Sequence, residues 1–350
     1  MRDFVRICHQ HAALTAALDR LEGLDALPEI ASRLRAFQQE VVADGMDGCA
    51  ATGFMSASND TLVRRIILLV ARRHRLPSVD WCWLALGSEG RHEQTFVTDQ
   101  DNALIFHASS AQEANALRDH FQTFAQEANQ RLADAGFKLC SGQIMAGNPA
   151  WCLSFDEWRD LFIDWVRRPD PSALLNASIF FDLRPLQGDS ELAEQLRTLF
   201  LSMTSDTPAM LHLMAANALQ AEAPLSFRGE PVVDTDEAID LKKFGSRIFV
   251  DAARIFALAH NVRAVNTRER LLQSGRAAGL QPGEIAAVNA AFGHILRLRL
   301  AQQMLSAQRG ETAGYGLKPA ALHEMDRAIL REALKQAKRL QQRLKLNYAL

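Results

Sequence analysis

The stretch from Leu84 to Phe106 restricts the possible folds of this chain more than any other segment. It is typical of an apolar strand, a Gly87-Ser88 turn, a short polar segment, and a second strand with Asp99 and Asp101 near its start. Two carboxylates at positions i and i+2 of a strand point to the same face, because strand side chains alternate. They repel each other unless a cation lies between them, and Mg²⁺ is commonly held by one or two carboxylates and substrate phosphates. The stretch therefore predicts a metal site beside a turn.

The Gly87-Ser88 turn precedes Asp99 by twelve positions. Backbone N–H groups and a serine hydroxyl at such a turn suit a phosphate. Each element alone has an ordinary explanation, since a Gly-Ser turn is often only a turn and an Asp-x-Asp pair is often a solvated strand edge. Their combination in this order favours a nucleotidyl-transfer site.

The pattern apolar-Gly-Ser followed by Asp-x-Asp resembles the signature of the polymerase-β-type nucleotidyltransferase superfamily. The fuller string, Gly-Ser-x-Gly-Arg-x-Glu over 87–93 and then Thr-Asp-x-Asp over 98–101, is similar to that of bacterial protein-PII uridylyltransferases and glutamine synthetase adenylyltransferases. It resembles still more closely their relatives of unassigned substrate, the signal-transduction nucleotidyltransferase-like proteins.

Two further stretches extend the resemblance over residues 60–350. Residues 182–189, Asp-Leu-Arg-Pro-Leu-Gln-Gly-Asp, are similar to a Glu-x-Arg-x-x-x-Gly-Asp stretch of the uridylyltransferases. Residues 242–251 resemble a Lys-x-Gly-Gly-Leu-Arg…Asp segment, although Phe244 replaces its first glycine and Ser246 its leucine.

The resemblance implies an α+β nucleotidyltransferase domain with a mixed sheet, flanked by N-terminal helices and followed by an all-α helical bundle. The expected boundaries are 1–75 for the N-terminal helices, 76–189 for the nucleotidyltransferase domain and 190–350 for a helical substrate-binding domain. The implied reaction transfers a nucleoside monophosphate from UTP or ATP to an acceptor hydroxyl, such as a tyrosine of a regulatory protein, with Mg²⁺ or Mn²⁺.

The implied roles fall on particular residues. Asp99 and Asp101 would hold the metal and carry catalysis. The phosphates would be bound by Gly87, Ser88, Arg91 and Lys243. Supporting residues would be Glu93, Asp182, Arg184, Lys242 and Asp251.

The superfamily's third metal-binding carboxylate has no counterpart in the expected strand, where residues 138–142 read Lys-Leu-Cys-Ser-Gly. Asp182 is a candidate substitute from the next segment; alternatively, Asp182 and Arg184 pair with each other at a strand end. Two rival functions stay open: a nucleotide-sensing or protein-binding module without turnover, and a structural adaptor whose C-terminal helices bind a protein.

Composition narrows the class of protein. The 350 residues carry a net charge of −2, so no global basic excess points to nucleic acid. Five cysteines without a Cys-x-x-Cys pair favour reduced thiols over a disulfide framework or a zinc site. Neither a signal peptide nor an apolar run long enough to span a membrane is found, so a cytoplasmic location is expected.

The periodicity of apolar residues predicts the remaining elements. We expect a loop over 45–59, a helix capped by Asp60, a long helix over 111–135 and a strand over 137–145. From residue 190 onward we expect helices and no strand, with a loop over 310–319. Four arginines of the Asp60 helix are either a phosphate-attracting stripe or a solvated face: Arg64, Arg65, Arg72 and Arg73. The tryptophans at 151, 158 and 165 either stack on a base or, more often at helical spacing, join the core.

Overall fold

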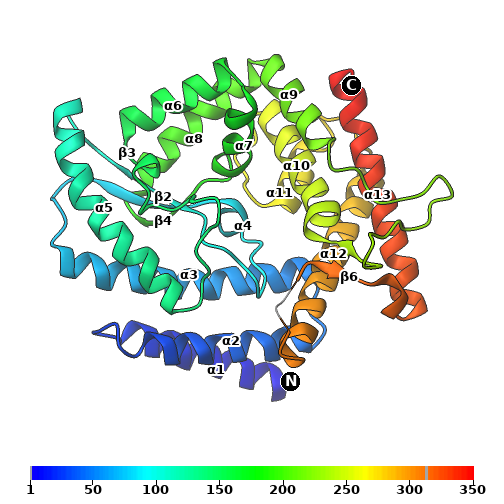
Figure 1. The fold of residues 1–350 in the computed structure, drawn as a ribbon, viewed down its shortest axis with the longest axis horizontal. Coiled ribbons are helices and arrows are strands. Elements are labelled where there is room, and N and C mark those ends of the chain that lie inside the picture. Colours follow the sequence, from blue (N-terminus) through cyan, green and yellow to red (C-terminus); the bar gives the residue numbers. More distant parts are fainter. Residues whose placement is uncertain (1, 312–313) are drawn as a thin grey trace.

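The computed structural model describes residues 2–311 and 314–350, with the side chains of residues 2–5 and 8 left aside. Outside the described part lie residues 312–313 of the expected 310–319 loop and the side chains of Phe4, Val5 and Cys8, which the helical spacing of the first 48 residues marks as apolar positions. A sheet-containing domain and a helical domain lie side by side, and two N-terminal helices run beneath the former (Figure 1). The described helices include none that is both long and apolar enough to cross a bilayer.

The sheet domain is built on a four-stranded mixed sheet in the order β3-β2-β1-β4. The central strand β1 is antiparallel to β2 and β4, whereas β2 and β3 are parallel. The strands are β1 (Trp81–Ala85), β2 (Asn102–Phe106), β3 (Cys152–Ser154) and β4 (Arg184–Gly188).

Helices cover both faces of this sheet. The N-terminal layer and one face carry α1 (Arg2–Asp19), α2 (Leu27–Ala43), α3 (Gly48–His74) and α5 (Ala111–Asp134). On the other face lie α6 (Phe155–Arg167), α7 (Pro171–Phe180) and α8 (Ser190–Ser205). Trp83 and Leu104 pack toward α3 and α5, while Leu84 and Ile105 pack toward α6 and α8. Because both faces are covered, β2 is buried along its whole length.

The helical domain contains α9 (Pro208–Ala218), α10 (Arg247–Ala259), α11 (Thr267–Ser274), α12 (Pro282–Gln308) and α13 (Glu324–Tyr348). One apolar core runs from the sheet through Phe200 of α8 to Phe249 of α10 and Leu334 of α13. The expected absence of strands after residue 190 is wrong in one detail, since β5 (Ile239–Asp240) pairs with β6 (Gly316–Leu317).

The loop expected over 45–59 is limited to residues 45–47, because α3 begins at Gly48. Asp47 caps α3 by accepting hydrogen bonds from the backbone of Cys49 and Ala50, and Asp60, the expected cap, is buried within the helix. The small residues that suggested a loop allow α3 to approach α12 closely. A Cβ at Gly48 would lie 2.0 Å from the carbonyl oxygen of Gly293.

The strand expected over 137–145 is also wrong. Only Lys138 forms a β-bridge there, to Asp99, and the strand beside β2 is β3. Two backbone hydrogen bonds, from the N–H of Gln100 to the Lys138 carbonyl and from the N–H of Asn102 to the Ile144 carbonyl, are supplemented by side-chain amides. The Gln100 side chain donates to the Phe137 carbonyl, and the Asn102 side chain accepts from the Ala146 N–H. The apolar segment before residue 186 likewise divides into α7, a turn at Asp182 and β4.

Two ambiguous sequence features are resolved by packing. Trp158 is fully buried and donates to the Leu104 carbonyl, and Trp165 belongs to the same core. Three of the arginines of α3 bind the chain itself, since Arg64 donates to the Leu186 carbonyl, Arg65 donates to the Leu21 carbonyl and Arg73 pairs with Glu127. None of the four arginines or the three tryptophans lines the cavity between the two domains.

The crossing of α3 and α12 gives a stability prediction. Gly48→Ala would drive a methyl group into the Gly293 carbonyl and to within 2.6 Å of the Arg297 nitrogen. We expect thermal unfolding to show that the free energy of unfolding falls by about 1–3 kcal/mol, which is typical of overpacking. Gly53→Ala in the same helix is the control, because nothing lies within 4 Å of its Cβ position. It should be neutral or stabilising, and equal melting temperatures for the two variants would contradict the assigned crossing.

Candidate active site

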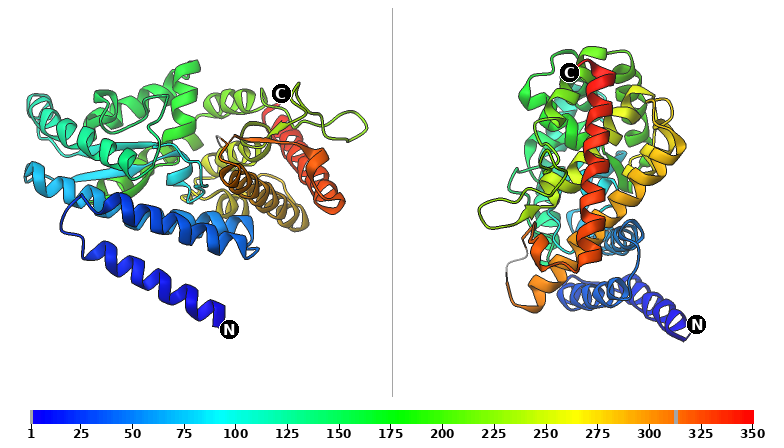
Figure 2. Two further views of the ribbon diagram at one scale, coloured as in Figure 1. Left: turned by 60° about the horizontal axis from the view of Figure 1, so that its bottom comes forward. Right: turned by 90° about the vertical axis from the view of Figure 1, so that its right-hand side faces the viewer.

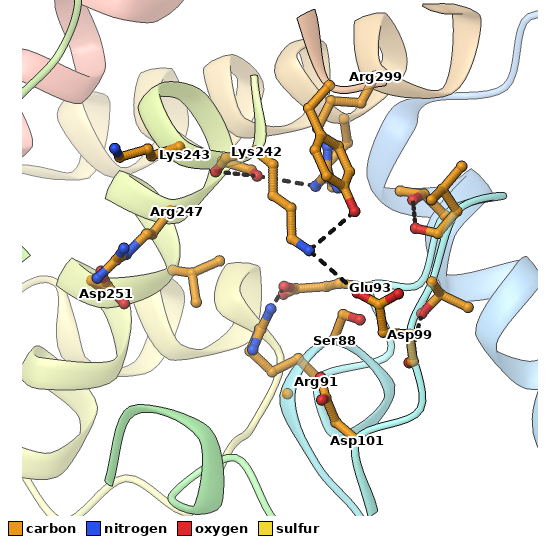
Figure 3. A pocket seen from close by; sticks show the side chains of 18 of the residues that line it. Ser88, Arg91, Glu93, Asp99, Asp101, Lys242, Lys243, Arg247, Asp251 and Arg299 are labelled. Carbon is orange, nitrogen blue, oxygen red and sulfur yellow. Dashed lines mark hydrogen bonds and ion pairs between the residues drawn. The ribbon is translucent and has the colours of Figure 1, made fainter. Parts of the chain in front are cut away.

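A cavity of about 380 Å³ opens between the sheet domain and the helical domain. The sheet domain supplies Gly87, Ser88, Asp99 and Asp101 to its wall. The helical domain supplies Lys242 from the π-helical turn after β5 (Lys242–Ser246), Arg299 from α12 and Tyr315 from the segment before β6. Figure 3 shows these side chains approaching one another from both domains. The cavity therefore unites most of the residues that the sequence singled out.

The turn after β1 is shaped by Gly87, which has φ of +51°. A Cβ at this position would lie 2.6 Å from Oδ2 of Asp101. The Leu86 N–H also donates to the Asp101 carbonyl at 2.9 Å, which ties the turn to the start of β2. Glycine is required here because both the left-handed backbone and the nearby carboxylate exclude a side chain. Ser88, in the one-turn helix α4 (Gly87–Gly90), is held beside the acidic pair.

Asp99 and Asp101 lie immediately before β2 rather than on it, and both line the cavity. Burial, together with the negative charge of Asp99, raises the pKa of Asp101 to about 6. Such a pair is a suitable donor set for a hard cation, because a bound ion relieves the repulsion. Over residues 2–311 and 314–350, no group of three His, Cys, Asp or Glu side chains is arranged to hold a metal. An ion at this pair would need oxygen ligands from substrate or water.

The two adjacent lysines have different positions. The Lys242 ammonium lies 3.9 Å from Oδ2 of Asp99 and 3.2 Å from the Tyr315 hydroxyl. Lys243 points away from the acidic pair, and its ammonium lies 4.9 Å from the centre of the Phe244 ring (Figure 3). The backbone N–H groups of both lysines donate to Asp240, which fixes this arrangement. The structure thus favours Lys242, the supporting residue, over Lys243 as the nearer cation.

Arg299 is a cavity residue that the sequence did not reveal. Its Nη1 donates to the Ser246 hydroxyl at 3.0 Å, and its buried Nε has no hydrogen-bond partner. Within the described residues it forms no ion pair with a carboxylate. Burial lowers its pKa to about 10, so the environment penalises its charge. In the sequence it is one of two arginines that alternate with leucines from Leu296 to Leu300 of α12, so no local signal distinguished it from Arg297.

Comparison with protein families agrees with this geometry. Residues 32–172 match the family model described as "Putative nucleotidyltransferase DUF294", and residues 208–348 match the one described as "Putative nucleotidyltransferase substrate binding domain". The chain belongs to this nucleotidyltransferase family. The family and the fold class expected from the sequence are therefore confirmed. A comparison with curated proteins finds no match.

Asp182 joins the nucleotidyltransferase domain to the substrate-binding domain. Its Oδ1 accepts from Arg254 at 3.0 Å and Arg270 at 2.6 Å. Its Oδ2 accepts from Arg254 and Arg91, both at 2.6 Å. We call Asp182 and these three arginines the arginine cluster. Burial alone would raise the pKa of Asp182, but the three guanidinium groups lower it well below its usual value.

This cluster changes three expectations. Asp182 has both oxygens engaged by guanidinium groups and is buried, so in this structure it does not replace the third metal ligand. It also does not pair with Arg184, which donates to Asp60 at 2.8 Å and to the Glu89 carbonyl at 3.1 Å. Arg91 lines the cavity, but Asp182 and Glu93 hold its guanidinium.

The supporting acids Glu93 and Asp251 extend the same network. Glu93 accepts from Arg91 at 2.8 Å and from the backbone N–H of Thr267 at 2.7 Å. Asp251 accepts from Arg254 at 2.7 Å and from Arg247 at 3.1 Å. Both acids therefore help to fix the position of the Gly87-Ser88 turn relative to α10 and α11.

The cluster predicts a strong effect of Asp182→Asn. Removing one partner of a buried ion pair costs about 3–5 kcal/mol, and here three guanidinium groups lose their shared carboxylate. Because the folded-state pKa is lowered, Asp182 contributes stability above the unfolded value of about 3.9, and this contribution is lost as pH falls through the folded value. Chemical unfolding at neutral pH should show a large loss in the free energy of unfolding of the variant. The difference in this free energy between the variant and wild type should shrink in acid.

Asp160→Asn is the matched control, because the Asp160 side chain is 68% exposed and pairs only at the surface of α6. It should change stability by less than about 1 kcal/mol. A wild-type stability for Asp182→Asn would contradict the structural role of the cluster.

Proposed function

We propose that this nucleotidyltransferase-family chain transfers a nucleoside monophosphate from an NTP to an acceptor hydroxyl. The observation that carries the proposal is the two-sided cavity, in which the Gly87-Ser88 turn and the acidic pair face Lys242 and Arg299. A polyphosphate with a divalent cation complements this cavity, because the cation suits the acidic pair and the phosphates suit the lysine and the arginine. By resemblance to the uridylyltransferases, the acceptor is a regulatory protein and the nucleotide is UTP or ATP.

The cations of the substrate-binding domain are suited to a triphosphate. Arg299 has no carboxylate partner among the described residues, and its burial is unfavourable unless an anion accompanies it. Lys242 lies near Asp99 at a distance too long for a strong charged hydrogen bond, so its ammonium is available to phosphate oxygens. The Ser88 hydroxyl on the opposite wall supplies a neutral donor.

Asp99 and Asp101 would hold Mg²⁺ or Mn²⁺, since carboxylate oxygens suit these ions. A bound ion would neutralise part of the charge of the triphosphate and would polarise the reacting phosphate. In the reaction, the acceptor oxygen forms a bond to the α-phosphorus. The bond between the α-phosphorus and the oxygen that bridges to the β-phosphorus breaks, so pyrophosphate leaves and the hydroxyl proton is released to solvent. The side chains of the cavity position the triphosphate and stabilise its charge, and none of them becomes covalently bonded.

A nucleotide sensor without turnover is the second candidate. The specific observation in its favour is that the described residues offer no third metal-binding carboxylate, because Asp182 belongs to the arginine cluster. The deciding experiment incubates the protein with each α-labelled NTP, Mg²⁺ or Mn²⁺ and cell lysate. Metal-dependent pyrophosphate release together with a labelled protein band supports transfer, whereas NTP binding without either supports the sensor.

The acidic pair gives a binding prediction. Asp101→Asn removes the charge but keeps the shape of a side chain that packs against Gly87. The Mg²⁺-dependent part of NTP affinity should fall by about tenfold or more, equivalent to about 1.4 kcal/mol. Calorimetric titration with and without Mg²⁺ measures this difference. Asp119→Asn on the exposed face of α5 is the control, and identical Mg²⁺–NTP affinities for the two variants would place the metal elsewhere.

The opposite wall gives a second prediction. Lys242→Ala and Arg299→Gln should each weaken NTP binding by about tenfold, because each removes a cation from the cavity. Lys243→Ala should have a smaller effect, since its ammonium points toward Phe244. The loss should be larger for a triphosphate than for the corresponding monophosphate. Wild-type NTP affinities for Lys242→Ala and Arg299→Gln would show that the triphosphate does not lie against this wall.

A further inference from the structure

A phenolic hydroxyl of the chain itself lies inside the proposed active site. Tyr315 lines the cavity together with the Gly87-Ser88 turn and the acidic pair. Its hydroxyl lies 3.2 Å from the Lys242 ammonium, which in turn lies 3.9 Å from Oδ2 of Asp99. Figure 3 shows Lys242 extending toward Asp99 from the opposite wall. A single side chain therefore links this hydroxyl to the carboxylates that would hold the metal.

The backbone and two cations hold Tyr315 in this position. It directly precedes β6, and its carbonyl accepts a hydrogen bond from the Leu241 N–H at 3.0 Å. The pairing of β5 with β6 continues immediately after it. The Lys242 ammonium and the guanidinium carbon of Arg299 lie 4.7 Å and 5.9 Å from the centre of its ring. These are the cations proposed to bind the triphosphate, so the ring and the phosphates would share one wall of the cavity.

Tyr315 differs from other hydroxyl groups of the cavity in its hydrogen bonding. Lys242 can only donate, so the phenolic proton of Tyr315 has no acceptor among the described residues. Ser88 belongs to the turn that would face the phosphates. The remaining four cavity hydroxyls each donate to a backbone carbonyl: Thr95, Thr98, Ser178 and Ser246. Unlike these four, Tyr315 can release its proton without the loss of a hydrogen bond within the protein.

The surroundings of the ring leave room for a nucleotide and for water. Gly314 and Gly316 flank Tyr315 without side chains. A Cβ at Gly314 would meet no atom closer than the Gly316 nitrogen at 4.0 Å. The tyrosine is half-buried, so part of its side chain is in contact with solvent. A proton released from the hydroxyl can therefore pass to water.

We propose that Tyr315 is a modification site, at which the chain transfers a nucleoside monophosphate to its own hydroxyl. The inference rests on the proposed function, with Tyr315 in the place of the acceptor protein. The phenolic oxygen forms a bond to the α-phosphorus, and the bond between the α-phosphorus and the oxygen that bridges to the β-phosphorus breaks. Pyrophosphate leaves, and the phenolic proton passes to solvent. Lys242, which donates to the phenolic oxygen, stabilises the negative charge that develops there.

The geometry makes this reaction intramolecular and self-limiting. Tyr315 lies in the cavity of its own chain, so no second copy is needed. The product is a phosphodiester of tyrosine, which keeps its nucleotide beside Lys242 and the acidic pair. A second NTP then finds its site occupied. Without an acceptor protein, the reaction should stop at one nucleotide per chain.

The test incubates the purified full chain with each α-labelled NTP and Mg²⁺ or Mn²⁺, without lysate. Wild type should incorporate up to one nucleotide per chain, and peptide mass spectrometry should locate it on Tyr315. Tyr315→Phe should lose the label. Tyr348→Phe is the matched control, because Tyr348 is the other tyrosine of the chain and lies at the end of α13, outside the cavity. It should be labelled as wild type is.

Label on another residue of wild type, or equal labelling of Tyr315→Phe and Tyr348→Phe, would overturn the modification site. The intramolecular geometry is tested by mixing untagged wild type with a tagged Asp101→Asn chain. The tagged chain should stay unlabelled, and the rate of labelling per wild-type chain should not depend on protein concentration. Label on the tagged chain would show transfer between chains and would overturn the assignment of Tyr315 to its own cavity.

A second readout needs no turnover. Both tyrosines are replaced by 3-fluorotyrosine, and Mn²⁺ is added with an α,β-methylene NTP, which cannot release pyrophosphate. The ¹⁹F signal of Tyr315 should broaden at a lower Mn²⁺ concentration than that of Tyr348, with Tyr348→Phe used to assign the two signals. Equal broadening of both signals would place the Tyr315 hydroxyl away from the metal and would overturn the inference.

The outcomes separate this inference from the proposed function. Pyrophosphate release and a labelled lysate protein, without label on Tyr315, would reject self-modification alone. Label on Tyr315 without any labelled lysate protein would support self-modification and reject a separate protein as the acceptor. The absence of both label and pyrophosphate release from every mixture would reject both proposals.

Discussion

The placement of the active-site cavity depends on the burial of charge around Asp182. Three guanidinium groups and three carboxylates meet there: Arg91, Arg254 and Arg270 with Asp182, Glu93 and Asp251. Isolated charges are costly to bury, so the arrangement is favourable only when both domains supply their members together. Arg91 immediately follows the α4 turn, and Arg254 lies in α10. The balance of charge thus fixes the Gly87-Ser88 turn relative to the substrate-binding domain.

Other charged groups of the cavity lie outside this balance. Asp99 and Asp101 are close enough for the charge of one to raise the pKa of the other. Across from them, Lys242 has only a long contact with Asp99, and Arg299 has no carboxylate among the described residues. Structural charges are paired in the cluster, while the cavity retains separate negative and positive sides. This division supports a polyanionic substrate that brings a cation with it.

The sequence predicted those features of the site that are formed by residues close together in the chain. The Gly87-Ser88 turn, the acidic pair and the strands around them were predicted because they lie within 25 residues. The partners of Asp182 lie 72 to 91 positions away, and no local pattern specifies them. The choice between Lys242 and Lys243 depended on a cap by Asp240 and a π-helical turn, which alter the direction of each side chain. The start of α3 was missed because small residues suit loops and close helix crossings equally well.

The length of α3 has a mechanical consequence. This 27-residue helix is about 40 Å long, contacts α5 and β4 beneath the sheet, and crosses α12 at Gly48. The helix therefore joins the two domains at a second point, apart from the covalent connection between α8 and α9 (Figure 1). Rotation of one domain about that connection alone would have to break the crossing of α3 and α12 at Gly48. Opening of the cavity that keeps this crossing intact is limited to rotation about the line through the two attachment points and to movements of side chains and of the segments at the mouth of the cavity.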